Sequence, residues 1–176
     1  AFIRGTTADP DDNVTLERES LALENLALAM AARNSGGFVA CQVERVAQAG
    51  SLTSRQVSIP GILVDCVVVA EPEHHMQTYG TRYNPAFSGE IRVPLESVPA
   101  LPLDERKIIA RRAAIEIRAG SVVNLGIGMP DNVGIVANEE RISDLMTLTV
   151  DPGVIGGVPM GGLDFGAAVN AQAIID

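Results

Sequence analysis

Apolar residues along this chain fall into short runs, and the spacing within each run predicts an element. Residues 1–5 predict the end of a strand, and residues 6–13, rich in Asp, Pro and Asn, predict a loop. Residues 19–34 predict a helix that is apolar on most faces and therefore buried on more than one side. Residues 38–46 and 59–70 predict two strands, the second interrupted by a Pro-Gly pair. Their continuous apolar runs are typical of strands covered on both faces.

The second part of the chain shows a different order of elements. Residues 71–102 lack a periodic pattern and predict a linker or a long functional loop. An amphipathic helix is predicted for residues 103–119, followed by a strand at 121–124, a glycine loop, a short helix at 131–140 and a strand that ends at Asp151. Helix, strand, loop, helix and strand in this order predict right-handed parallel crossovers. The predicted fold class is therefore α/β, with parallel sheets and flanking helices.

The helix predicted at 103–119 has an apolar stripe and a basic side that we expect to face solvent. The stripe holds Ile109, Ala110, Ala113, Ala114 and Ile117, and the basic residues are Lys107, Arg111, Arg112 and Arg118. Gly120 is expected to cap the helix.

Composition narrows the function classes. The chain has 176 residues, 47% of them hydrophobic and 20% charged, which suits one ordinary domain or parts of two rather than a disordered segment. A net charge of -9 argues against nucleic acid or an anionic membrane as the main partner. Without a long apolar run or a signal peptide, the expected location is cytoplasmic. The apolar beginning without Met suggests a chain cut from a longer one.

Cysteine and histidine spacing predicts no metal site. Cys41 and Cys66 lie in apolar runs, and their spacing fits neither a zinc site nor a redox pair, so core packing is expected. His74 and His75 are adjacent and in an extended segment would point to opposite sides, so they cannot chelate one ion together. Surface or interface packing is the expected role of both histidines.

Two glycine-containing stretches are the candidate sites. The apolar run at 148–150 ends in Asp151, and six glycines follow between residues 153 and 166. A strand that ends in an acid and opens into a loop is typical of ligand sites in α/β proteins, although Asp-Pro-Gly also forms a plain turn without any function. The second stretch, Asn-Leu-Gly-Ile-Gly at 124–128, lacks the third glycine of a dinucleotide fingerprint. Its glycines would still let backbone amides approach an anion or an oxyanion.

Taken together, five segments resemble the middle of the fused, two-half family I coenzyme A transferases of the acetate, propionate and acetoacetate type. The segments are Ala-Phe-Ile-Arg-Gly-Thr-Thr-Ala-Asp from residue 1, Pro-Gly-Ile-Leu-Val-Asp from residue 60, Tyr-Asn-Pro-Ala-Phe-Ser-Gly-Glu from residue 83, Asn-Leu-Gly-Ile-Gly from residue 124 and Leu-Thr-Val-Asp-Pro-Gly-Val-Ile-Gly-Gly from residue 148. The resemblance implies two related α/β halves, both incomplete: the end of the first at 1–70, a linker at 71–102 and the start of the second at 103–176.

The resemblance also implies a chemistry. In that family a strand-end glutamate attacks an acyl-CoA thioester, and a glutamyl-CoA thioester then passes coenzyme A to a short-chain carboxylic acid. The place of the glutamate aligns with Asp151, the implied catalytic residue. The residues implied near coenzyme A are Asn124, Gly126, Gly128, Gly153, Gly156 and Gly157. Acyl-CoA and the acid are substrates, with no permanently bound cofactor, no metal, and a homo-oligomer or a complementing chain as the expected assembly.

The chain departs from the family pattern at this residue. Asp151 is one methylene shorter than glutamate, which retracts the carboxylate by about 1 Å, and misplacements of this size cost on the order of a hundredfold in rate. Impaired transfer is one expectation. The alternatives are an acyl-CoA thioester hydrolase, in which the retracted carboxylate acts as a general base on water, and a non-catalytic, truncated fragment that is stable only as an oligomer.

Overall fold

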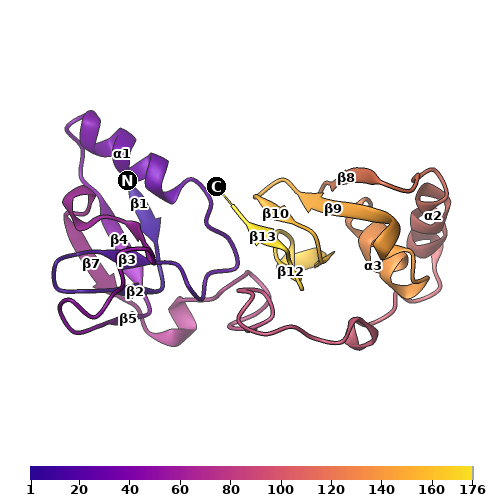
Figure 1. The fold of residues 1–176 in the computed structure, drawn as a ribbon, viewed down its shortest axis with the longest axis horizontal. Helices are drawn as coiled ribbons and strands as arrows, with labels where there is room; N and C mark the ends of the chain where they lie inside the picture. Colours follow the sequence, from indigo (N-terminus) through magenta and orange to yellow (C-terminus); the bar gives the residue numbers. More distant parts are fainter. Residues whose placement is uncertain (176) are drawn as a thin grey trace.

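Parallel strand pairs at the two ends of an elongated molecule organise the fold (Figure 1). The computed structural model describes residues 1–175. Residues 1–70 form one end, here called the first lobe, and residues 103–175 form the other, the second lobe, with the connecting segment 71–102 between them. The predicted α/β class with parallel sheets and helices is confirmed. The relation between two halves of a longer protein stays a prediction.

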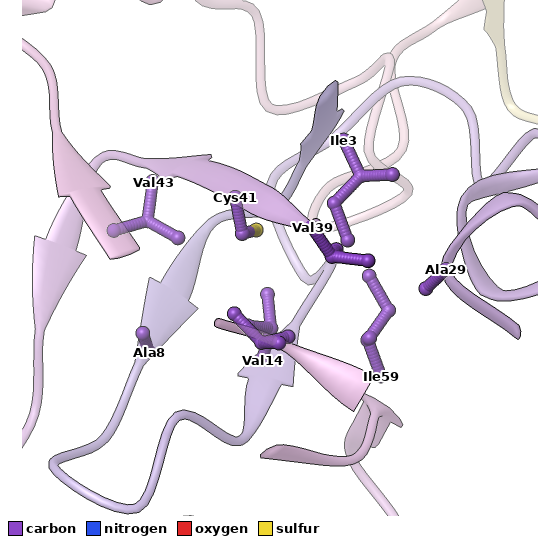
Figure 2. Close-up of a cluster of buried hydrophobic side chains, with 9 residues drawn as sticks. Ile3, Ala8, Val14, Ala29, Val39, Cys41, Val43 and Ile59 are labelled. Carbon is purple, nitrogen blue, oxygen red and sulfur yellow. The ribbon is translucent and has the colours of Figure 1, made fainter. Parts of the chain in front are cut away.

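The first lobe contains two sheets and one helix. A parallel sheet has the order β1 (Phe2–Arg4), β4 (Ala40–Val43), β7 (Cys66–Val69). The second sheet has the order β5 (Arg45–Val46), β2 (Thr7–Ala8), β3 (Val14–Thr15), β6 (Val57–Ile59). Side chains from both sheets and from α1 (Asn25–Asn34) form one apolar core, in which Cys41 is fully buried (Figure 2). Core packing was the expected role of this cysteine.

The predicted strand at 38–46 is divided between these two sheets. β4 pairs with β1, and β5 pairs with β2. The break falls at Glu44, whose N–H donates to Thr6 O at 2.9 Å, opposite the point where the chain itself passes from β1 to β2. The second predicted strand is interrupted as expected: β6 ends at Ile59, a 3-10 turn follows at Gly61–Leu63, and β7 begins at Cys66. The predicted loop at 6–13 is partly wrong, because it contains β2.

The helix predicted at 19–34 is shorter than expected. α1 begins only at Asn25, because Leu23 has a positive φ of 53° that no α-helix allows. Residues before it are held by polar contacts instead, among them the Ser20 hydroxyl, which donates to Gln77 O at 3.1 Å. The apolar pattern of the predicted helix continues through residues 19–24. Side chains there bond to other segments instead, as Ser20 does to Gln77.

The second lobe follows the predicted order of elements. α2 (Glu105–Ala114), β8 (Ser121–Leu125), α3 (Asp131–Glu139) and β9 (Met146–Val150) succeed one another, and β8 pairs with β9 in parallel. The sheet continues through antiparallel β10 (Val154–Ile155) and β13 (Ala173–Ile174), with a separate ribbon of β11 (Val158–Pro159) and β12 (Ala168–Val169).

Expectations for the end, the cap and the two faces of the helix at 103–119 are wrong. α2 ends at Ala114, its last turn loosens into 3-10 hydrogen bonds, and the Gly120 N–H donates to Leu145 O rather than capping the helix. Lys107 is buried, whereas Ile109 of the predicted apolar stripe is half exposed. Lys107 tolerates burial because its Nζ donates to Leu101 O at 3.0 Å and pairs with the Glu139 carboxylate.

Only one face of the β8–β9 pair is covered. Leu125, Leu148 and Val150 point into the core shared with α2 and α3. The other face carries Val122, which is 73% exposed, and Asn124, also exposed. Parallel strands are commonly covered on both faces, so this open face distinguishes the pair from an ordinary parallel sheet. The arrow of β9 points from the second lobe toward the first (Figure 1).

The connecting segment is packed rather than loose. All of residues 71–102 are described, and they form two 3-10 turns but no α-helix or strand. Ala86 and Phe87 are buried against Val158, Ala167 and Val169 of the second lobe. At its other end, Gln77 Nε2 donates to Arg18 O at 2.8 Å. The segment therefore contacts both lobes, while its role as a linker between family halves stays a prediction.

In the described part of the chain, residues 1–175, no helix combines the length and apolarity that crossing a bilayer requires.

Candidate functional site

Three polar side chains stand in a row on the open face of the β8–β9 pair. Thr149 of β9 lies opposite Asn124 of β8 in the register, and its hydroxyl donates to Asn124 Oδ1 at 3.0 Å. Asn124 Nδ2 then donates to Asp151 Oδ1 at 2.5 Å. Because the hydroxyl engages the amide oxygen, the amide nitrogen is directed at the carboxylate. Sequence reasoning named Asn124 and Asp151 but missed Thr149, which period-two alternation places on the same face as residue 151.

Asp151 is exposed and is the second residue of a tight turn that begins at Val150, the last residue of β9. Gly153 N–H donates to Val150 O at 3.1 Å and closes the turn. Gly153 has a φ of 99°, and a Cβ at this position would lie 2.0 Å from Ile175 O. Only glycine fits there, so the turn fixes where the strand ends and where the carboxylate emerges.

Gly126 and Gly128 form the loop between β8 and α3. A Cβ at either position would meet no atom within 4 Å, so the space beside this loop is open. Gly128 has a φ of 96°, which favours glycine, whereas Gly126 has no positive φ. The loop is tied at its end by Asp131, because the Gly128 N–H donates to Asp131 Oδ2 at 3.3 Å.

Asp131 is a residue that sequence reasoning missed. It is 3% exposed, and burial raises the pKa of its carboxyl, although backbone N–H groups of Gly128 and Gly162 oppose that rise. Asp131 thus holds the glycine loop against the segment after β11. Its sequence signal was an acidic residue in the first turn of a helix, where the helix dipole favours negative charge.

Gly156 and Gly157 lie in the turn between β10 and β11 and have packing roles. Gly156 N–H donates to Leu148 O at 2.7 Å. A Cβ on Gly156 would stand 2.6 Å from Gln172 Cγ, and one on Gly157 would stand 2.3 Å from Val169 O. These close approaches explain both glycines without a ligand. Their contact with coenzyme A stays a prediction.

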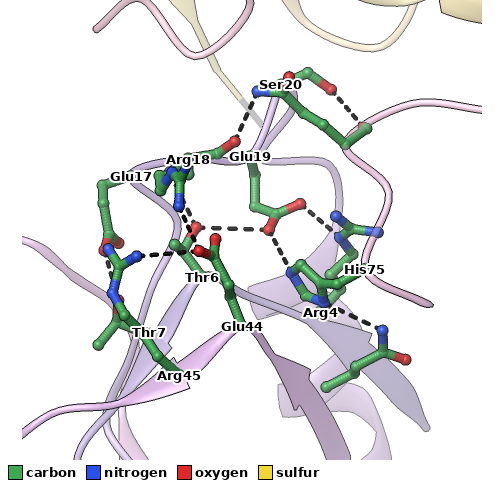
Figure 3. A network of polar contacts seen from close by, with 12 residues as sticks. Arg4, Thr6, Thr7, Glu17, Arg18, Glu19, Ser20, Glu44, Arg45 and His75 are labelled. Atoms are coloured by element: carbon green, nitrogen blue, oxygen red, sulfur yellow. Dashed lines mark hydrogen bonds and ion pairs between the residues drawn. The ribbon is translucent and has the colours of Figure 1, made fainter. Parts of the chain in front are cut away.

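A second polar cluster lies in the first lobe, around Glu19 (Figure 3). Arg4 Nε donates to Glu19 Oε2 at 2.6 Å, and His75 Nε2 lies 3.2 Å from Glu19 Oε1. Burial raises the pKa of Glu19, but the hydrogen bond from His75 and the Arg4 charge outweigh it, so the pKa is lowered. Surface or interface packing was expected for His75, and the surface role is wrong, because the side chain is 7% exposed. Both of its ring nitrogens have partners, which compensates for the burial.

No metal centre is assembled from the usual ligands within residues 1–175, where no group of three or more His, Cys, Asp or Glu side chains is placed to hold an ion. Cys41 and Cys66 are both free thiols. Burial, with a smaller contribution from the Glu19 charge, raises the pKa of the Cys41 thiol to about 12, so it is not a nucleophile at neutral pH. The role of Asp151 as the nucleophile stays a prediction.

The sequence of the chain is similar to those of known coenzyme A transferases. Residues 1–70 match the family described as Coenzyme A transferase. The chain is 48% identical, over 177 aligned residues, to the caffeate CoA-transferase of Acetobacterium woodii, covering 100% of this chain and 34% of that protein. The resemblance to coenzyme A transferases is confirmed. The acetate CoA-transferase YdiF of Escherichia coli O157:H7 is 43% identical over 176 residues, with 100% of this chain and 33% of that protein aligned.

The fold of this chain agrees with a solved structure. The crystal structure of the acyl-CoA transferase YdiF apoenzyme from Escherichia coli O157:H7 superposes with a TM-score of 0.85 at 42% identity, covering 100% of this chain and 32% of that one. A thioester complex of YdiF with CoA gives a TM-score of 0.84 at 40% identity, again over 100% of this chain and over 33% of that one. The chain spans about a third of the length of the curated relatives that it matches.

Proposed function

We propose that this chain carries the nucleophilic carboxylate of a coenzyme A transferase, and that Asp151 moves coenzyme A between an acyl-CoA and a short-chain carboxylic acid. The observation that carries the proposal is the exposed Asp151 carboxylate at the end of β9, oriented by the Asn124 amide. An amide is a neutral donor, so it positions the carboxylate without neutralising its charge. Similarity to CoA-transferases over the whole chain supports the same assignment.

The reaction would proceed through two covalent states of Asp151. A carboxylate oxygen attacks the thioester carbonyl, the C–S bond breaks, and coenzyme A leaves as a thiolate from an acyl-aspartyl anhydride. The thiolate then attacks the aspartyl carbonyl, the anhydride C–O bond breaks, and the original acid leaves as its carboxylate. An aspartyl-CoA thioester remains. An incoming carboxylate runs the same two steps in reverse, which yields the new acyl-CoA and free Asp151. Covalent catalysis divides one difficult exchange into easier steps.

The glycine loop supplies the second part of the proposed site. Gly126 and Gly128 follow Asn124 in the loop after β8, and the open space beside them admits the backbone amides to a ligand carbonyl. Gly153 shapes the turn that presents Asp151. A homo-oligomer or a complementing chain is also part of the proposal, as the assembly in which Asp151 acts.

Incubation of the protein with acetyl-CoA and butyrate tests the proposal. We expect butyryl-CoA to form and a CoA thioester to be found on the peptide that contains Asp151 by mass spectrometry. Absence of both adduct and transfer would contradict a catalytic role for this chain. Thiol release that does not need butyrate would instead support the hydrolase alternative, and strict dependence on the acid would exclude it.

Lengthening the side chain tests whether geometry limits the rate. Asp151→Glu advances the carboxylate by about 1 Å, and placement errors of that size cost on the order of a hundredfold. We expect transfer to rise by about tenfold or more in this variant, measured as initial rate of butyryl-CoA formation. An unchanged or slower rate would show that the aspartate is already correctly placed.

A further inference from the structure

A cavity of about 320 Å³ opens at the carboxyl edge of the parallel sheet in the first lobe. Its lining includes Arg4, the last residue of β1, and Glu44, which follows β4. His75 lines it as well, after the end of β7. In open α/β sheets ligands bind beyond the carboxyl ends of the strands, so topology places this cavity where a ligand site is expected. It shares no residue with the open face of β8 and β9.

Positive charge is in excess in this cavity. Its lining holds three arginines, Arg4, Arg18 and Arg82, but only two carboxylates, Glu19 and Glu44. Both carboxylates already have cationic partners: Glu19 pairs with Arg4, and Glu44 pairs with Arg18 and also with Arg45 outside the cavity. Arg82 is exposed and forms no ion pair within residues 1–175. In a chain with a net charge of -9, a local cationic excess selects for an anion.

Two of the three arginines, Arg18 and Arg4, are held in place by surrounding side chains. The Arg18 guanidinium lies 3.6 Å from the centre of the Tyr83 ring. It is also paired with Glu44 (Figure 3). Arg4 contributes only its Nε to the hydrogen bond with Glu19, and its terminal NH₂ groups have no protein acceptor in the described residues. Guanidinium groups that are already positioned lose little freedom when they bind a carboxylate in the bidentate manner.

His75, the buried histidine of the cavity, has a hydrogen-bond partner at each ring nitrogen. Gln42 Nε2 lies 2.8 Å from His74 O and 3.1 Å from His75 Nδ1, so the amide N–H groups face both acceptors. His75 Nδ1 therefore accepts, and its Nε2–H is the donor to Glu19 Oε1. His75 thus occupies Glu19 Oε1, and Arg4 occupies Glu19 Oε2. The surplus guanidinium donors are what remains for a ligand.

We propose that this cavity is a binding site for a small monocarboxylate, held by Arg82, Arg18 and Arg4. A monoanion matches the single excess positive charge of the lining, whereas a dianion would meet the carboxylates of Glu19 and Glu44 without enough compensating charge. The site goes beyond the proposed transfer reaction, since every lining residue lies between Arg4 and Tyr83 and none belongs to the Asp151 row.

Titration of the ¹⁵N-labelled protein with sodium butyrate at constant ionic strength tests the site by NMR. We expect saturable shifts at the amides of residues that line the cavity. Arg82→Gln removes the exposed guanidinium without breaking an ion pair, and should weaken binding by about tenfold. Arg55→Gln is the matched control, because Arg55 is an exposed arginine outside the cavity. It should leave the affinity unchanged.

Two more variants and a second anion complete the test. Arg18→Lys keeps the positive charge but loses the planar guanidinium that binds a carboxylate through two hydrogen bonds. It should also weaken butyrate binding. Unaltered binding in both cavity variants, no shifts at the cavity, or equal loss in Arg55→Gln would overturn the proposal. Inorganic phosphate that binds as tightly as butyrate would overturn the monocarboxylate class. Asp151→Asn should bind butyrate at the cavity as before, so this test stands even where the transfer reaction fails.

Discussion

The carboxyl edges of the two parallel strand groups hold carboxylates in opposite states. At the first edge, Glu19 is buried and paired with Arg4, and it receives a hydrogen bond from His75. At the second, Asp151 is exposed and contacts a neutral amide. A carboxylate engaged by a cation is stabilised as an anion and is a poor nucleophile, whereas one held by a neutral donor keeps its reactivity. One edge is therefore suited to binding and the other to chemistry.

Removing the reactive carboxylate is the most severe test of this comparison. In Asp151→Asn the side chain keeps its size but loses the attacking oxygen, so we expect transfer to fall by about a thousandfold or more, with no CoA adduct. Initial rates and intact-protein mass measure both. Asp144→Asn is the matched control, because Asp144 is an exposed carboxylate in the same lobe and should be silent. Retained transfer in Asp151→Asn would remove the distinction between the two edges.

The amide that orients Asp151 should matter next. Asn124→Ala deletes the donor, and we expect transfer to fall by about a hundredfold, as for other positioned donors in active sites. Thr149→Val acts one step further away, through the orientation of the amide, so a loss of about threefold is expected. Thr147→Val, on the same face of β9 and without a hydrogen bond to Asn124, is its control. Equal rates in the Thr149 and Thr147 variants would show that the row is incidental.

Strand and helix order in the second lobe could be predicted from the sequence because each element there is continuous and local. The two residues that shape the site but escaped prediction, Thr149 and Asp131, act through partners on other segments. A threonine in a strand or an aspartate in a first helical turn is common, so neither position stands out alone. The burial of Glu19 and Lys107 escaped prediction for the same reason. It depends on partners that are 15 and 32 residues away along the chain.

Stability should depend on pH through Glu19 at the first edge. The pKa of Glu19 is lowered in the folded chain from an ordinary value of 4.5, so its stabilisation is present above that pH. It is lost as the pH falls through the lower, folded value. Glu19→Gln should lower the free energy of unfolding by about 3 kcal/mol at neutral pH, because Arg4 and His75 lose a buried anionic partner.

Urea unfolding at several pH values measures this effect. The difference between the parent and Glu19→Gln should shrink as the pH falls below the ordinary value of 4.5 and through the lower folded pKa of Glu19. Glu116→Gln breaks the exposed pair with Arg112 and should change stability by less than about 0.5 kcal/mol. Parallel curves for the parent and Glu19→Gln across the acid range would contradict a buried, ionised Glu19.

The smallest effects separate glycines required by the backbone from glycines that leave space for a ligand. Gly126 and Gly128 both have open surroundings, but only Gly128 has a positive φ, of 96°. Gly128→Ala should therefore cost about 1 kcal/mol of stability, and Gly126→Ala less than about 0.5 kcal/mol. If the loop lies against the thioester as proposed, Gly126→Ala should nevertheless raise the KM for acyl-CoA, because its new methyl group occupies the open space. A variant that changes neither stability nor KM would place the ligand away from this loop and leave Asp151 as the whole of the reactive edge.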